Sequence, residues 1–216
     1  MDFATARRMM VDGQIRTRDV FDLRLLAAFR EVPRERFVPE GRLSYVDLDV
    51  PLDPSGRGRR LLRPMVLARL LQAAEITAED RVLDVGCATG YSSALLARIA
   101  AEVVALEEDA DLSERAQRAL RELAAAVTVV RGALSGGWPP RAPYDVIVVE
   151  GAVEFVPRPL LDQLADGGRL VCILGAGPAG KGMVFRSVQG EASGRPIFDA
   201  AGPLLPGFAK PPAFVF

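Results

Sequence analysis

The chain has 216 residues, of which half are hydrophobic and a quarter are charged, and its formal net charge is −1. This composition excludes a mainly disordered chain and gives no general attraction for nucleic acid. Histidine is absent, which excludes Ser-His and Cys-His nucleophile pairs and the usual zinc ligand. Cys87 and Cys172 show neither a metal-ligand spacing nor a disulfide framework. We therefore expect no metal, and chemistry that relies on carboxylates, a cofactor or positioning.

The first third of the chain has the pattern of a helical region. Apolar residues at helical spacing predict helices over residues 3–11 and 19–31. A loop rich in Gly, Pro and Arg spans residues 39–60, and Pro64 fits the first turn of a helix that runs to about residue 74. The N-terminus lacks the apolar core of a signal peptide, and no segment approaches the roughly 20 apolar residues of a membrane helix. We expect a cytoplasmic protein that does not bind membranes.

From residue 80 onward, strand and helix patterns alternate, which predicts an α/β fold with a doubly wound, mostly parallel sheet. We expect one domain over residues 1–216, with N-terminal helices and a substrate loop in 1–78 and a cofactor-binding core in 79–216. Asp166-Gly167-Gly168 predicts a turn before a strand, and the C-terminal part is expected to contain a hairpin-like excursion. The predicted strands are 81–85, 102–106, 127–131, 145–149, 169–174 and 183–188, and the predicted helices are 91–100, 111–123 and 157–165.

The most informative segment is residues 82–90, Val-Leu-Asp-Val-Gly-Cys-Ala-Thr-Gly. An apolar strand carries Asp84 near its end, and glycines at both ends of the following turn allow close approach of a ligand to the backbone. The third glycine of a dinucleotide fingerprint is missing, because serines occupy that region. A carboxylate such as Asp84 suits an amino-acid ammonium group better than a diphosphate. The predicted cofactor-binding residues of this segment are Asp84, Gly86, Cys87, Ala88, Thr89 and Gly90.

S-adenosylmethionine carries such an ammonium group and no phosphate. Glu107 stands at the end of the next predicted strand, where an acidic residue commonly takes ribose hydroxyls, and Glu108 adjoins it. The alternative is that Glu107, Glu108 and Asp109 form a solvated loop. Together with the glycine turn, these residues favour S-adenosylmethionine as the cofactor. Methyl transfer to a carboxylate also suits a chain without histidine, because a carboxylate is already an anion at neutral pH and needs no strong base.

Several segments resemble the protein-L-isoaspartate O-methyltransferases. Residues 10–15, Met-Val-Asp-Gly-Gln-Ile, are similar to the family's opening motif, and residues 32–39, Val-Pro-Arg-Glu-Arg-Phe-Val-Pro, are similar to its Val-Pro-Arg-Glu-x-Phe-Val-Pro. Gly167-Gly168-Arg169-Leu170 and a closing strand at Phe214-Val215 also follow the pattern. The resemblance implies a seven-stranded, Rossmann-like methyltransferase sheet with an N-terminal helical extension.

The same resemblance implies a repair reaction on isoaspartyl-containing proteins or peptides. The α-carboxyl group of an isoaspartyl residue is methylated, and the ester closes to a succinimide that reopens partly to aspartate. We expect a monomer, with a dimer as the alternative.

Two positions depart from the family pattern. The family has Thr-Ile-Ser-x-Pro before the third helix, with a serine that assists at the substrate carboxylate, whereas this chain has Leu62 in the serine's place. The family's Gly-Asp-Gly, whose aspartate takes part in adenine recognition, corresponds here to Gly132 followed by Ala133. Three arginines near Leu62 offer an alternative way to bind a carboxylate, since guanidinium groups pair with carboxylates in a bidentate manner. They are Arg59, Arg60 and Arg63, and a solvated loop is the other interpretation of the same residues.

These departures leave three hypotheses open. The chain is an isoaspartyl methyltransferase, or a methyltransferase that acts on another acid or peptide with the arginine-rich loop as its specificity element, or a binding module without turnover.

Overall fold

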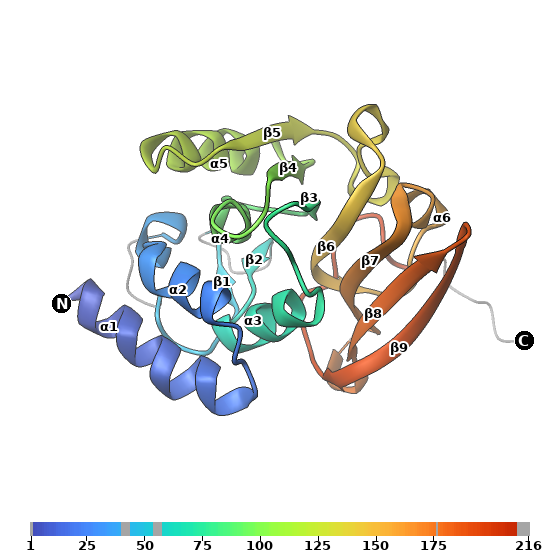
Figure 1. The fold of residues 1–216 in the computed structure, drawn as a ribbon. Helices are drawn as coiled ribbons and strands as arrows, with labels where there is room; N and C mark the ends of the chain where they lie inside the picture. The colour runs from blue at the N-terminus through green and yellow to red at the C-terminus, as the bar shows by residue number, and fades with distance from the viewer. Residues whose placement is uncertain (1, 40–43, 54–57, 176, 211–216) are drawn as a thin grey trace, which may run out of the picture.

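A seven-stranded sheet forms the centre of the protein (Figure 1). The computed structural model describes residues 2–39, 44–53, 58–175 and 177–210. The strand order is β5-β4-β3-β6-β7-β8-β9, and the first five strands in this order run parallel while β8 and β9 are antiparallel to their neighbours. This arrangement confirms the predicted mostly parallel sheet. The strands are β3 (Arg81–Val85), β4 (Glu102–Glu107), β5 (Val127–Arg131), β6 (Tyr144–Val153), β7 (Leu164–Leu174), β8 (Lys181–Val188) and β9 (Glu191–Asp199).

Helices cover the sheet on both faces. The N-terminal helices lie with α4 and α5 on one side of the sheet, and α6 lies on the other (Figure 1). The prediction of one domain over residues 1–216 stays a prediction, since residues 211–216 lie outside the described part of the chain. The helices are α1 (Phe3–Met10), α2 (Leu23–Glu31), α3 (Pro64–Ala73), α4 (Tyr91–Leu96), α5 (Ala110–Glu122) and α6 (Arg158–Leu161).

The alternation of side chains along the strands divides the buried residues into two cores. Val82 of β3 packs in the core on the side of the N-terminal helices, whereas Leu83 and Val85 pack in the core on the side of α6. Successive residues of a strand point to opposite faces of the sheet. Asp84 therefore shares the face of Val82, and its hydroxyl partners on α4 lie on that same face.

Helix ends differ from the predicted ones for local reasons. The second helix begins at Leu23 rather than residue 19, because the Asp22 carboxylate caps it by accepting hydrogen bonds from two backbone N–H groups and Asp19 adopts a left-handed conformation. A π-helical turn over Val11–Ile15 continues α1. Helix α4 ends at Leu96 instead of residue 100, and α6 is shorter than predicted because β7 already begins at Leu164.

The C-terminal half contains one strand, β9, that is not among the predicted strands. β9 pairs with β8 through a turn at Gln189-Gly190, which confirms a hairpin in this region. The predicted turn at residues 166–168 lies inside β7, as an irregularity in its pairing with β6, and not before the strand. Two short strands, β1 (Val50–Pro51) and β2 (Arg60–Leu61), pair in the segment predicted to be a loop. The predicted closing strand at Phe214-Val215 lies outside the described residues.

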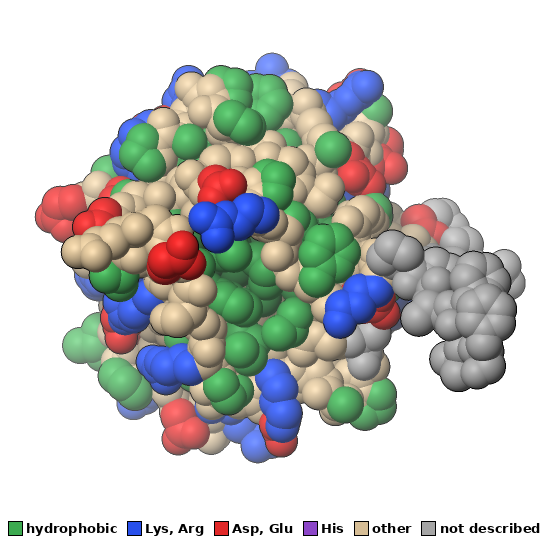
Figure 2. Space-filling view, turned by 90° about the vertical axis from the view of Figure 1, so that its right-hand side faces the viewer, with side chains coloured by type: hydrophobic (Ala, Val, Ile, Leu, Met, Phe, Trp, Pro, Cys, Tyr) green, Lys and Arg blue, Asp and Glu red, His purple; other side chains and the backbone are tan. Residues whose placement is uncertain are grey.

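Across the described ranges, no helix is long and apolar enough to cross a membrane. On the face shown in Figure 2, basic and acidic side chains are interspersed. That face therefore offers no extended basic area for a nucleic-acid backbone.

Candidate active site

Three buried carboxyl groups lie at the ends of adjacent parallel strands. Asp84 of β3 is paired in register with Ala105 of β4 and Val148 of β6. Glu107 lies two residues after Ala105 on β4, and Glu150 lies two residues after Val148 on β6. The side chains of Asp84 and Glu107 are completely buried, and Glu150 is 6% exposed. Ligands of open α/β sheets bind at the carboxyl ends of the strands beside the change in strand order. The three acids therefore lie where a ligand of such a sheet is expected to bind.

Glu150 occupies an irregular part of β6. The pairing of β6 with β7 shifts in register between Val148 and Ala152, and such bulges often re-aim a side chain next to a functional site. The backbone N–H of Ala152 donates to the carbonyl oxygen of Pro203 at 2.8 Å, and a Cβ atom on Gly151 would stand 2.8 Å from that oxygen. Glu150 directly follows the predicted strand 145–149, so it shows the same signal as Asp84, an acid at the end of an apolar strand, although the sequence analysis assigned it no role.

Asp84 and Glu150 share an environment that disfavours negative charge. The Asp84 Oδ2 atom accepts hydrogen bonds from the hydroxyl groups of Ser92 and Ser93 at 2.7 and 2.5 Å, and burial nevertheless raises the Asp84 pKa to about 6. Burial and the nearby Asp84 carboxylate raise the pKa of Glu150 well above its ordinary value. Within the described structure, Asp84 Oδ1 and Glu150 Oε1 are buried without a hydrogen-bond partner. The pair is thus short of donors, and a cation beside it would stabilise both groups.

The turn between β3 and α4 has the backbone shape that its glycines predict. Gly86 and Gly90 have φ angles of +78° and +93°, which are unfavourable for residues with a Cβ atom. The N–H groups of Gly86 and Cys87 donate to the carbonyl oxygen of Leu106 at 2.8 and 3.2 Å, which joins the turn to β4. The hydroxyl of Thr89 donates to the Phe37 carbonyl, so this side chain anchors the turn to the N-terminal region.

Glu107 is the most heavily hydrogen-bonded acid of the site. Its Oε2 atom accepts from the Ala88 N–H at 2.8 Å, and its Oε1 atom accepts from the N–H groups of Glu108 and Asp109 at 3.0 and 3.1 Å. Oε1 also accepts from Nη1 of Arg59 at 2.7 Å. Because Glu107 is completely buried, the solvated-loop interpretation is wrong for this residue.

The residues expected on the adenine side lie beside Glu107. The N–H of Gly132 donates to the Glu107 carbonyl oxygen at 3.2 Å. A Cβ atom on Gly132 would stand 3.4 Å from the ring of Trp138, and Ala133 is exposed at the start of a short 3₁₀ turn. The structure therefore brings together the strand-end residues of β3, β4 and β5 that the sequence selected.

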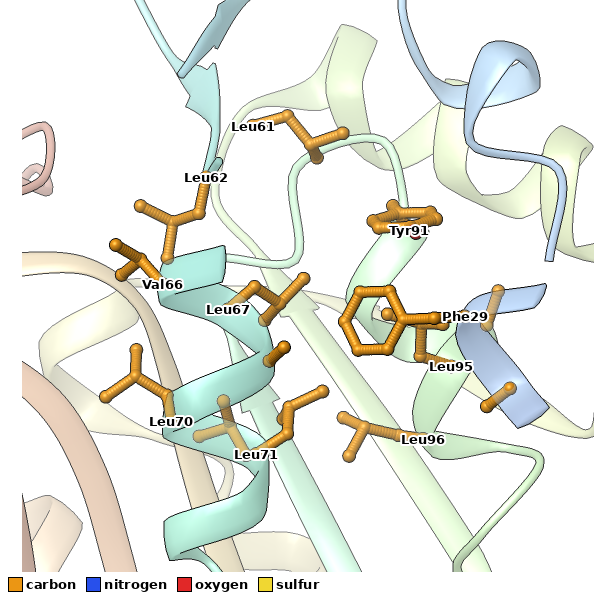
Figure 3. Packing of buried hydrophobic residues seen from close by; sticks show 14 of the residues in the cluster. Phe29, Leu61, Leu62, Val66, Leu67, Leu70, Leu71, Tyr91, Leu95 and Leu96 are labelled. Atoms are coloured by element: carbon orange, nitrogen blue, oxygen red, sulfur yellow. The ribbon is translucent and has the colours of Figure 1, made fainter. Parts of the chain in front are cut away.

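The position of the family serine is apolar, because Leu62 belongs to the hydrophobic core. The Leu62 side chain is 1% exposed and lies beside Val66 among apolar neighbours (Figure 3). Its carbonyl oxygen accepts a hydrogen bond from Nη2 of Arg34 at 2.8 Å. The guanidinium of Arg34 is fully buried and stacks over the Tyr91 ring, while its Nε and Nη1 atoms have no partner among the described residues. The sequence identified Arg34 only as part of a family motif.

The three arginines near Leu62 all have partners, two of them at Asp49 and one at the strand ends. Arg63 pairs with Asp49 through its backbone N–H and its guanidinium, with Nη2 and Oδ2 3.1 Å apart. Arg60 donates to the Asp49 carbonyl oxygen at 3.3 Å. Only Arg59 reaches the strand ends, where it contacts Glu107 and the carbonyl oxygen of Gly86. The binding of a substrate carboxylate by Arg60 or Arg63 stays a prediction, and both side chains are engaged at Asp49.

Comparison with known families identifies this arrangement. Residues 5–194 match the family model described as protein-L-isoaspartate(D-aspartate) O-methyltransferase. The chain belongs to this family. A protein-L-isoaspartate O-methyltransferase of Methanoculleus marisnigri is 44% identical over 172 residues, which are 78% of this chain and 77% of the relative. Protein-L-isoaspartate O-methyltransferase 1 of Rhodopseudomonas palustris is 42% identical over 183 residues, which are 84% of this chain and 74% of the relative.

Solved structures agree with the methyltransferase family. One named protein-L-isoaspartate O-methyltransferase superposes with a TM-score of 0.81 at 25% identity and covers 93% of this chain and 66% of its own. A protein-L-isoaspartate O-methyltransferase of Plasmodium falciparum, described as putative and as a complex with S-adenosyl-L-homocysteine, shares the fold with a TM-score of 0.77 at 16% identity, over 91% of this chain and 96% of its own. Together with the family match, these findings confirm the predicted Rossmann-like fold, the methyltransferase class and S-adenosylmethionine as its cofactor.

Proposed function

We propose that this protein transfers a methyl group from S-adenosylmethionine to the α-carboxyl group of isoaspartyl residues in proteins or peptides. The observation that carries the proposal is the placement of Asp84, Glu107 and Glu150 at three adjacent strand ends in a chain of this family.

The buried acids fit the polar groups of the cofactor. The unpartnered oxygens Asp84 Oδ1 and Glu150 Oε1 suit an ammonium group, which brings three donors and a positive charge. Glu107 suits the ribose hydroxyls. Further cofactor contacts are assigned by this proposal to Gly86, Cys87, Ala88, Thr89, Gly90, Glu108, Gly132 and Ala133.

The proposed reaction requires little acid or base catalysis from the protein. When bound, the cofactor supplies an electrophilic methyl group on a positively charged sulfur. A substrate carboxylate oxygen gains the methyl group as the methyl–sulfur bond breaks, and the electron pair of that bond remains on sulfur, so that no proton is transferred. Catalysis by this chain then consists of holding the carboxylate in line with that bond and excluding water. The absence of histidine is consistent with such a reaction.

A second candidate is methyl transfer to a different acid or peptide. The observation in its favour is that Leu62, at the position of the family serine, is buried and apolar. Leucine offers no hydrogen bond to a substrate, and the guanidinium groups of Arg60 and Arg63 contact Asp49.

Transfer of labelled methyl groups to paired peptides tests the proposal. One peptide contains an isoaspartyl residue, and its control has the same sequence with a normal aspartyl residue. We expect label in the isoaspartyl peptide alone. Label in both peptides, or in neither while S-adenosylhomocysteine still binds, would support the second candidate or the binding-module hypothesis instead.

A further inference from the structure

Arg59 places its guanidinium at two acceptors of the proposed cofactor site. Its Nη1 atom lies 2.7 Å from Glu107 Oε1, and its Nη2 atom donates to the Gly86 carbonyl oxygen at 2.8 Å. The side chain is 13% exposed, and its partner Glu107 is completely buried. A Cβ atom on Gly86 would stand 3.1 Å from Nη2, so the guanidinium lies directly against the glycine turn.

Glu107 is already heavily hydrogen-bonded, and most of its donors meet at one oxygen. An ionised carboxylate offers about two lone-pair sites on each oxygen. Oε1 accepts from the N–H groups of Glu108 and Asp109 and from Nη1 of Arg59, whereas Oε2 accepts from the Ala88 N–H alone. Three of these donors belong to the backbone of the two strand-end turns. Only Arg59 can leave without unfolding those turns. Two ribose hydroxyls that each bind one oxygen of Glu107 can leave Ala88 in place at Oε2, but the hydroxyl at Oε1 must replace Arg59.

We infer that Arg59 is an internal competitor for the ribose-binding carboxylate, which the cofactor displaces when it binds. The inference rests on the proposed function, since it takes Glu107 as the ribose ligand. In this arrangement Arg59 sets the cofactor affinity of the protein, and in the cofactor-free state it neutralises a carboxylate that would otherwise be buried without a counter-charge.

The structure also offers a place for the displaced side chain. Arg59 forms part of the wall of a cavity of about 230 Å³, which is further lined by Leu52, Asp53, Gly58, Asp109, Asp111, Leu112 and Arg115. Three of these residues carry carboxylates. A guanidinium that turns away from Glu107 can therefore enter this cavity, where the carboxylates favour a positive charge.

Calorimetric titration of S-adenosylhomocysteine into wild-type protein and the Arg59→Ala variant tests the inference. The matched control is Arg115→Ala, which removes the same charge beside the same cavity but whose guanidinium contacts Leu52 and Asp111, not Glu107. We expect Arg59→Ala to bind about tenfold more tightly than wild type, because no charge-assisted hydrogen bond has to be broken. The control should bind as wild type does.

Thermal unfolding is a second readout, and it still tests the inference if a variant is destabilised. Without ligand, Arg59→Ala should melt below wild type, since Glu107 loses its counter-charge, and saturating S-adenosylhomocysteine should raise its melting temperature by more than that of wild type. Arg59→Lys, which cannot bridge both acceptors, should lie between the two. Equal or weaker binding by Arg59→Ala would overturn the inference. Absence of binding by every variant and by wild type would instead refute the proposed function.

Discussion

The guanidinium of Arg34 donates from Nη2 to the carbonyl oxygen of Leu62 at 2.8 Å, and this bond ties the N-terminal region to the residue at the family's serine position. Arg34 belongs to the Val-Pro-Arg-Glu segment, which follows α2, whereas Leu62 lies two residues before the start of α3. The bond is fully buried, and the guanidinium also stacks over Tyr91 at 4.7 Å from the ring centroid. The Val-Pro-Arg-Glu segment is thus tied to the backbone of residue 62.

We expect the Arg34 side chain to support the fold more by its volume than by its charge. Burial lowers the pKa of its guanidinium, and two of its nitrogen atoms lack a partner in the described structure. Arg34→Met keeps most of the volume, and we expect it to change the free energy of unfolding by no more than about 1 kcal/mol. Arg34→Ala leaves a cavity and should cost about 3 kcal/mol. Urea unfolding distinguishes them, and equal losses in both variants would show that the charge itself is required.

Replacement of Leu62 by serine tests the substrate side. Because Leu62 packs in the core, its truncation should destabilise the protein by about 2–4 kcal/mol. Leu62→Ala is the matched control, since it creates a similar cavity without a hydroxyl group. If the chain lacks the family's catalytic hydroxyl, isoaspartyl methylation should rise in Leu62→Ser and not in Leu62→Ala. Equal activities in the two variants would place the carboxylate contact elsewhere.

Glu150→Gln tests the proposed ammonium site. Loss of one charge-assisted hydrogen bond should weaken S-adenosylhomocysteine binding about tenfold or more. Methylthioadenosine, which lacks the amino-acid part of the cofactor, is the matched control ligand and should bind wild type and variant equally. A similar loss for both ligands would mean that Glu150 supports the structure and not the ammonium group.

Cofactor binding should depend on pH through the same pair of acids. Burial raises the Asp84 pKa from 3.8 to about 6, so the folded protein holds this proton more tightly than the unfolded chain. The stability that Asp84 contributes is complete below pH 3.8 and is lost as the pH rises through about 6. An ammonium ligand requires the ionised form, so binding should strengthen as the pH rises through 6, by up to about tenfold per pH unit below it.

Calorimetry in two buffers of different ionisation enthalpy measures the protons released on binding. We expect release near pH 6 in wild type and less in Asp84→Asn, whose side chain cannot ionise. Identical proton release by the two proteins would contradict the assignment of this pH dependence to Asp84.

The buried acids at the strand ends and the glycine turn were largely predictable because their signals are local. A buried strand that ends in Asp84 and a turn that needs positive φ at Gly86 and Gly90 are visible in consecutive residues, and the expected acid at Glu107 follows one strand later. The contacts of Arg59 could not be predicted in this way. Its two acceptors come from β4 and from the turn after β3, far along the chain, and nothing in the local pattern distinguishes it from Arg60.

Glu150 and β9 also have features that local sequence patterns do not predict. The importance of Glu150 depends on a register shift in β6 and on the approach of Pro203 to its neighbouring backbone. β9 contains Gly194 and Pro196 and has few buried residues, so it lacks the apolar alternation that predicts a strand. Its pairing with β8 is what makes it a strand.

All of these roles depend on one claim, that Asp84, Glu107 and Glu150 form a single cofactor site. Titration of S-adenosylhomocysteine into the wild-type protein at pH 8 tests it most directly. We expect saturable binding of one ligand per chain, weakened in both Asp84→Asn and Glu150→Gln. Absence of heat at millimolar ligand, or binding that neither variant weakens, would contradict it.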